Sequence, residues 1–208
     1  VQDQFKEIPG SPVAYWVSDR FRSLFGQGET LHDWNVHPAT GLQTGDNPRF
    51  IRCWWEIDRE RADQKWVPLN DGGSLRKWYG NLVSHLNWES EGAELRAHKS
   101  SVVRNQKYYF QEGGTWSRIS SAYFAVRLLP EGFIFDQAGD SFFADDRKDL
   151  LTMLAFLNTT ICHSVMKILC PTLNATAGNV ELFPYPKKAK HHSDQIHTGV
   201  ECLVDSSR

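Results

Sequence analysis

The clearest pattern of apolar and polar positions lies between residues 146 and 169. Asp145 or Asp146 supplies an acidic start and Pro171 a stop, so the pattern predicts one long helix over residues 146–169. The apolar positions recur three and four apart, which is the spacing of one helix face: Leu150, Leu154, Leu157, Ile161, Val165 and Ile168. We expect this face to pack behind a sheet.

Short β-branched and aromatic runs fill most of the chain before this helix. Turn residues such as Asn70-Asp71-Gly72-Gly73 separate them about every 8–12 residues, which favours antiparallel pairing. The pattern predicts strands at residues 12–18, 53–57, 66–69, 75–81, 82–88 (the last two separate or one bent ribbon), 107–110, 115–120, 122–129, 132–136 and 182–186.

Capping residues predict two short helices. Ser18-Asp19 precedes the first, over residues 21–25, and Asp46 or Asn47 caps the second, with Pro48 at its first position. Residues 89–106 are charged and expected to be partly helical. The fold class is therefore α+β, with a mostly antiparallel or mixed sheet and a long packing helix. Residues 1–186 form the predicted domain, and residues 187–208 a polar linker with the start of a following segment.

Composition limits the classes of function. The 208 residues carry a net charge of −2, so the chain lacks the basic balance of an isolated nucleic-acid-binding module. A DNA contact has to come from local patches or from a larger protein. The apolar stretch 150–169 is interrupted by polar residues and no signal peptide is visible, so we expect a cytoplasmic protein without a membrane span. Because it starts at Val1 and ends where an apolar pattern resumes, we expect a fragment.

The sequence predicts no catalytic, cofactor-binding or metal-ligating residue in this chain. It lacks the GxSxG, HExxH, SxxK and Walker motifs. Asn47-Pro48-Arg49-Phe50 departs by one residue from the Asn-Pro-Pro-aromatic motif of amino-methyltransferases, and helix entry explains it better. The cysteines form no CxxC pair and are expected to be reduced and structural, while His191, His192 and His197 leave a weak adventitious metal site open.

Polar and cationic side chains gather on three turns. Arginine presents a planar fork to guanine or phosphate, asparagine can pair with adenine, and hydroxyls reach phosphates or bases. Surface charge and core aromatic residues would give the same pattern, so composition alone leaves both interpretations open. The candidate DNA-binding residues are Thr44, Asn47, Arg49 and Arg52, then Arg76, Lys77 and Tyr79, then Thr115, Ser117, Arg118 and Ser120.

Several stretches resemble one family in the right order along the chain. They are residues 8–25, 41–57, 65–81, 108–121, 129–143, 150–160 and 171–186, among them GLQTGDNPRFIRCWWEI and LPEGFIFDQAGDSFF. They are similar to the C-terminal part of the adenine-specific DNA methyltransferases of bacterial BREX phage-resistance systems, the PglX family. The 150–160 and 171–186 stretches also resemble target-recognition domains of type I specificity subunits and of fused restriction-modification enzymes.

The resemblance implies a DNA target-recognition domain whose catalytic half lies upstream. That N-terminal methyltransferase domain would hold S-adenosylmethionine, and this piece would bind double-stranded DNA and position it for base flipping, without activity of its own. By this resemblance, Thr44, Asn47 and Arg49 in and beside the GLQTGDN turn face the DNA. The stretches around Arg76 and Thr115 are assigned the same role. One alternative is a protein-interaction module that uses a tryptophan-rich surface to assemble defence-system subunits. A complete small enzyme is another, which no motif supports.

Overall fold

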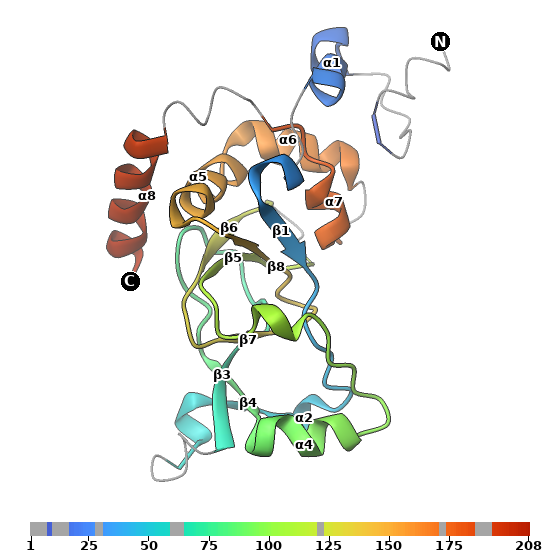
Figure 1. The fold of residues 1–208 in the computed structure, drawn as a ribbon, viewed down its shortest axis with the longest axis vertical. Coiled ribbons are helices and arrows are strands. Elements are labelled where there is room, and N and C mark those ends of the chain that lie inside the picture. The colour runs from blue at the N-terminus through green and yellow to red at the C-terminus, as the bar shows by residue number, and fades with distance from the viewer. Residues whose placement is uncertain are drawn as a thin grey trace.

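The strands come from distant parts of the sequence and form two separate sheets. The structure is a computed structural model of the chain and describes residues 8–9, 17–27, 31–58, 65–119, 123–170, 174–185 and 193–208. Within these residues two four-stranded sheets lie between helices at the upper end and helices at the lower end of the molecule (Figure 1). The α+β class and the largely antiparallel, mixed pairing are confirmed, while the likeness to specificity subunits stays a prediction.

The first sheet has the strand order β1-β8-β5-β6 and is antiparallel throughout. Its strands are β1 (Val36–Ala39), β5 (Gly113–Trp116), β6 (Val126–Leu129) and β8 (Ser141–Ala144). The helices around it are α5 (Arg147–Leu157), α6 (Thr160–Leu169), α7 (Ala177–Glu181) and α8 (Ser193–Ser207). Side chains of the sheet and of these helices share one core that includes Trp34, Trp116 and Tyr185. Helix α5 thus packs on the sheet as predicted.

The second sheet has the order β2-β4-β3-β7, and its β3–β7 pair is parallel. Its strands are β2 (Ile51–Cys53), β3 (Trp66–Asn70), β4 (Ser84–Asn87) and β7 (Ile134–Phe135). Helices α2 (Asn47–Phe50) and α4 (Glu89–Ala97) lie at the lower end of the molecule in Figure 1. Leu69 and Phe135 of this sheet share a buried cluster with Leu129 and Phe143 of the first sheet, so this second core joins the two sheets.

The prediction of one long helix over residues 146–169 is wrong, because two helices occupy this stretch at 76° to each other. Asn158 ends α5, and its side-chain amide pairs with the backbone of Val126, accepting from its N–H (3.0 Å) and donating to its carbonyl (2.8 Å). Thr159 then caps α6 by accepting from the Cys162 N–H. The spacing of apolar residues continues through both helices, so it does not reveal the bend.

No single helix in the described part of the chain is long and apolar enough to cross a membrane.

Both short helices are confirmed. The first is α1 (Asp19–Gln27), and the second is α2, where Asp46 accepts from the Arg49 N–H as the cap and Pro48 stands in the first turn. Three predicted strands are wrong. Residues 54–56 and 106–108 form the 3₁₀ turns η3 (Trp54–Glu56) and η4 (Gln106–Tyr108), and residues 75–81 form a loop. The strand predicted at residues 12–18 lies almost entirely outside the described residues.

The C-terminal residues also differ from the expectation. Residues 193–207, predicted as part of a polar linker, form α8, and Val200 and Val204 on its inner face belong to the first core. Arg147 of α5 forms ion pairs with Glu201 of α8 and with Glu112, and Lys148 pairs with Asp194. A strand was predicted over residues 182–186, of which the described residues 182–185 hold only an isolated bridge residue.

Candidate nucleic-acid interface

The structure divides the predicted DNA-binding residues between two places. Thr44, Asn47, Arg49 and Arg52 lie around α2, at the lower end of the molecule in Figure 1, and we call them the α2 group. Arg76, Lys77 and Tyr79 lie on residues 71–83, which connect β3 to β4, and we call this segment the crossover loop. Ser117 and Arg118 directly follow β5. Ser120 lies outside the described residues.

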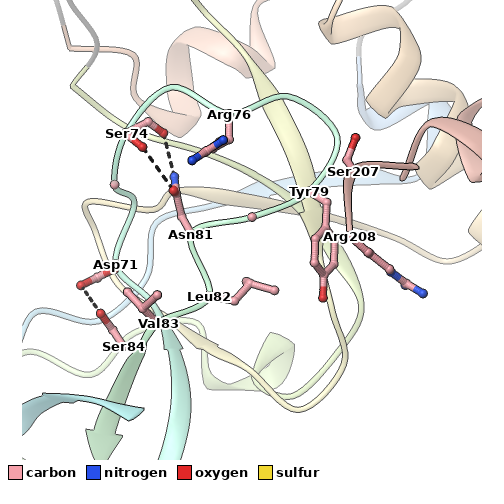
Figure 2. A pocket seen from close by; sticks show the side chains of 12 residues that line it. Asp71, Ser74, Arg76, Tyr79, Asn81, Leu82, Val83, Ser84, Ser207 and Arg208 are labelled. Carbon is pink, nitrogen blue, oxygen red and sulfur yellow. Dashed lines mark hydrogen bonds between the residues drawn. The ribbon is translucent and has the colours of Figure 1, made fainter. Parts of the chain in front are cut away.

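The crossover loop leaves the second sheet and returns to it, and on the way it pairs with the first sheet. The N–H of Trp78 donates to the carbonyl of Val126 (3.1 Å), and the N–H of Leu128 donates to the carbonyl of Trp78 (2.8 Å). Figure 2 shows two further bonds that fix the loop: Asn81 Nδ2 donates to the Ser74 carbonyl (2.7 Å) and Ser84 Oγ donates to Asp71 (2.7 Å). The loop therefore holds a defined path between the sheets.

The buried side chain of Arg127, on β6, anchors the crossover loop by hydrogen bonds. Its side chain is only 1% exposed, and its Nη2 donates to the carbonyl of Gly72 (2.6 Å) and to Asn70 Oδ1 (3.2 Å). Its Nη1 contacts Ser117 Oγ (3.4 Å). Burial lowers the pKa of Arg127 to about 10, opposed by the nearby charge of Asp71, so the guanidinium stays protonated at neutral pH. One buried cation thus joins the ends of β3 and β5.

Two of the residues predicted to contact DNA are buried in the structure, so their assignment is corrected. Thr115 is fully buried because both faces of β5 are covered, and its hydroxyl contacts Asn70 Nδ2 (2.7 Å) and the Asp140 carbonyl (3.0 Å). Thr44 is 2% exposed and donates to Asn47 within the α2 turn. Neither side chain is accessible to a duplex, so both are structural residues in this conformation.

Two surface hollows flank the crossover loop and share Gly73. One, of about 630 Å³, is lined by Arg76, Tyr79 and Arg208 among others, and Figure 2 shows their side chains around it. The other, of about 560 Å³, is lined by the polar residues Ser117, Arg118, Gln137 and Asn174 and also by Ile119 and Ala138. Ser117 Oγ donates to the Gly73 carbonyl (2.8 Å), and this bond joins the segment after β5 to the crossover loop. We call the two hollows and the loop between them the crossover surface.

The cations of the crossover surface are only partly neutralised by the protein. Arg76 is exposed and makes no hydrogen bond or ion pair with another described residue. Lys77 Nζ donates to the carbonyl of Asn158 (3.2 Å). Arg118 Nε donates to Asn174 Oδ1 (3.0 Å) and lies 4.0 Å from Asp140 Oδ2. Among the three, Arg76 therefore has no partner in the described part of the chain, whereas Lys77 and Arg118 are each held by a group of the protein.

Two buried carboxyl groups lie beneath the second hollow. Burial raises the pKa of Asp140 to about 6, with Arg118 opposing the shift. Burial also raises the pKa of Asp136 to about 7, although the Asp136 carboxyl accepts from the N–H groups of Ala138 (2.7 Å) and Gly139 (3.1 Å). Near neutral pH Asp136 therefore carries less than a full negative charge, which limits its repulsion of a polyanion.

The cations of the α2 group already have partners within the protein. Arg49 donates through Nε (2.8 Å) and Nη2 (2.6 Å) to one oxygen of Glu94, which holds the pKa of Glu94 below its usual range. Arg52 Nη1 donates to the carbonyls of Pro48 (2.5 Å) and Ile51 (2.7 Å), and its guanidinium lies 5.8 Å from the Trp66 ring centre. The exposed Asn47 begins α2. The charge of Arg49 is thus neutralised by Glu94, whereas Arg52, like Lys77, is held by backbone carbonyls.

The described residues show no cluster of three or more His, Cys, Asp or Glu side chains that could hold a metal ion. Within the described residues the four cysteines form no disulfide with one another: Cys53, Cys162, Cys170 and Cys202. Burial raises the pKa of Cys162 to about 12, so this thiol stays protonated and packs as an apolar group.

Comparisons with known proteins show that the chain is similar to a segment of two longer proteins. It is 38% identical over its whole length to a protein named adenine-specific methyltransferase PglX from Lacticaseibacillus casei (strain Zhang), and it covers 18% of that protein. It is also 38% identical, over 97% of its length, to adenine-specific methyltransferase BrxX from Escherichia coli O9:H4 (strain HS), of which it covers 17%. The chain thus spans less than a fifth of these relatives. No family model matches it.

Proposed function

Because the chain corresponds over its whole length to a segment of PglX- and BrxX-type adenine-specific methyltransferases, we propose that it is the DNA target-recognition part of such an enzyme. In this proposal the parent enzyme transfers a methyl group from S-adenosylmethionine to adenine N6 in a phage-defence or restriction-modification system. The methyl-donor site lies outside this chain, and the chain selects and holds the DNA without catalysing a step. The parent is a cytoplasmic protein in this proposal.

The observation that carries the proposal is the crossover surface. Arg76, Lys77 and Arg118 lie on two loops that are hydrogen-bonded to each other and anchored by one buried arginine, so the backbone that carries these cations has a fixed path at the junction of the sheets. Phosphate contacts from such cations set the register of a duplex, and neighbouring polar groups read the base edges. Because the chain is slightly acidic overall, the local arrangement supplies the attraction.

The proposed mechanism follows from what adenine methylation requires. The target base has to leave the stack before its N6 can be reached, which costs a few kcal/mol. A domain that grips the duplex beside the target offsets part of this cost and fixes which adenine enters the catalytic site. Arg76 and Lys77 would contact phosphates, and the side chains of the second hollow would face the bases.

The first prediction concerns DNA binding by the chain itself. We expect wild type to bind a random-sequence duplex with an affinity that falls steeply as salt rises, measured by fluorescence anisotropy. Replacing Arg76 and Lys77 by Gln should weaken binding about tenfold or more at low salt. It should also reduce the slope of log affinity against log salt by about 2, since each lost phosphate contact removes about 0.9.

A matched control removes two charges elsewhere. Lys99 follows α4 and Lys107 lies on η4; both are exposed and neither belongs to the crossover surface, so Lys99→Gln with Lys107→Gln should leave the salt slope within about 0.5 of wild type. Equal loss in both double variants would mean that only net charge matters and would contradict the assignment of the site. Absence of DNA binding by folded wild type would contradict the function.

A second function, a protein-interaction module, is favoured by one observation. Trp54 and Trp55 on η3 are 54% and 60% exposed, with ring centres 5.5 Å apart in an edge-to-face arrangement. Exposed tryptophan is enriched at the energetic centres of protein interfaces. The same titration separates the two functions, because a module that binds only protein shows no salt-dependent affinity for DNA.

A further inference from the structure

The turn between β7 and β8 presents one glutamine to the second hollow from a rigid frame. The Gln137 N–H donates to the carbonyl of Leu42 (2.9 Å), and the Arg118 N–H donates to the carbonyl of Ala138 (2.9 Å). The Asp136 carboxyl accepts from the next two N–H groups of the turn, those of Ala138 and Gly139. Backbone bonds to two other segments and one side chain therefore fix the position of Gln137.

Glycines let this turn pack directly against the crossover loop. A Cβ on Gly72 would lie 2.5 Å from the carbonyl oxygen of Ala138, and one on Gly139 would lie 2.4 Å from Asn70 Nδ2. Gly72 also has a φ of +84°, a conformation that other residues rarely adopt. The turn and the loop thus form one unit, and a DNA contact on the loop places the duplex beside the turn.

The side chain of Gln137 is half-buried, and its amide forms no hydrogen bond with another described residue. Its polar neighbours in the hollow are Ser117, Arg118 and Asn174. Asn174 Oδ1 already accepts a hydrogen bond from Arg118 Nε, whereas the Gln137 amide has both an acceptor and a donor available. A neutral amide is a poor partner for phosphate compared with the cations beside it, but it matches a base edge that offers one donor and one acceptor.

We propose that Gln137 is a specificity-determining residue that reads a base edge, preferentially adenine, in the major groove of the bound duplex. The inference rests on the proposed function and deepens it by naming the reader. Glutamine pairs with adenine through N6 and N7 in a two-bond arrangement that the other bases do not offer. The sequence gives no signal for this residue, since a single glutamine in Phe135-Asp136-Gln137-Ala138-Gly139 has no motif around it.

The experiment selects bound sequences from a random duplex library and counts them for each variant. We expect wild type to enrich adenine at one or more positions, and Gln137→Ala to reduce the preference at one such position by about 5- to 100-fold. Affinity for a random duplex should stay within about twofold of wild type, since no phosphate contact is lost. Gln137→Glu should shift the preference at that position toward cytosine, because a carboxylate accepts from cytosine N4.

The control is Gln111→Ala, an exposed glutamine whose amide bonds the carbonyl of Lys107. It should leave every base preference unchanged. If folded Gln137→Ala and Gln137→Glu select the same sequences as wild type, or if wild type binds without any preference, the role of Gln137 is refuted while DNA binding stands. If wild type does not bind DNA, the proposed function and this inference both fail.

Discussion

Replacing Arg127 by Ala should lower the free energy of unfolding of the chain by about 2–4 kcal/mol. The change leaves the carbonyl of Gly72 and Oδ1 of Asn70 without their donor in a buried region, and each unsatisfied group costs about 1–3 kcal/mol. A cavity where the guanidinium lay adds to this loss. Urea denaturation followed by circular dichroism gives the change as a shift of the midpoint.

The matched control for this prediction is Arg76→Ala. Arg76 is an exposed arginine of the crossover loop without a partner among the described residues, so its loss should change stability by less than about 0.5 kcal/mol. If Arg127→Ala costs no more than Arg76→Ala, Arg127 does not hold the two sheets and the loop together. The fixed geometry of the crossover surface would then lack its main anchor.

Replacing Asp136 by Asn should change how stability depends on pH. The pKa of Asp136 is about 7 in the folded chain and near 4 when unfolded, so between these values the folded chain binds more protons. Its contribution is complete below about pH 4 and is lost as the pH rises to about 7. Asparagine has the shape of the protonated acid and does not titrate, so the variant should be more stable than wild type at pH 8 by about 2 kcal/mol or more.

The difference between variant and wild type is the quantity to measure, from urea midpoints between pH 4 and pH 8. It isolates Asp136 from Asp140 and Asp71, the other carboxyl groups that influence the site. A matched control is Asp205→Asn, which removes the same charge from the exposed end of α8. A difference for Asp136→Asn that stays flat, or that favours wild type as pH rises, would contradict the burial of an acid with a raised pKa.

Local chemistry made part of the fold predictable from sequence. The cap at Asp46 with Pro48 behind it defines α2 without help from distant residues, and β3 follows from a short apolar run that ends in a strong turn signal. The bend between α5 and α6 was not predictable, because it depends on the Asn158 amide pairing with a backbone 32 residues away. Helix α8 was missed because only a few of its positions, such as Val200 and Val204, are buried.

The residue types of the candidate site were predictable, because arginine, lysine and hydroxyl residues next to turn signals can be identified from the sequence. Arg76, Lys77 and Arg118 lie on loops, although the hydrophobic pattern predicted strands over residues 75–81 and 115–120. Thr115 was assigned wrongly, because sequence alone does not show that the sheet is covered on both faces at this strand. Gln137 was missed, since its significance comes from a turn held by residues distant in sequence and from the hollow it lines.

The most direct test of the central claim is hydrogen exchange of the chain with and without a saturating duplex. The account predicts that DNA slows exchange in peptides covering residues 71–83, 117–119 and 136–139, the segments that form the crossover surface, and leaves α2 and η3 unchanged. Protection confined to residues 44–57, with none in the crossover loop, would contradict the account, because it would place the duplex at the α2 end of the molecule and not at the junction of the sheets.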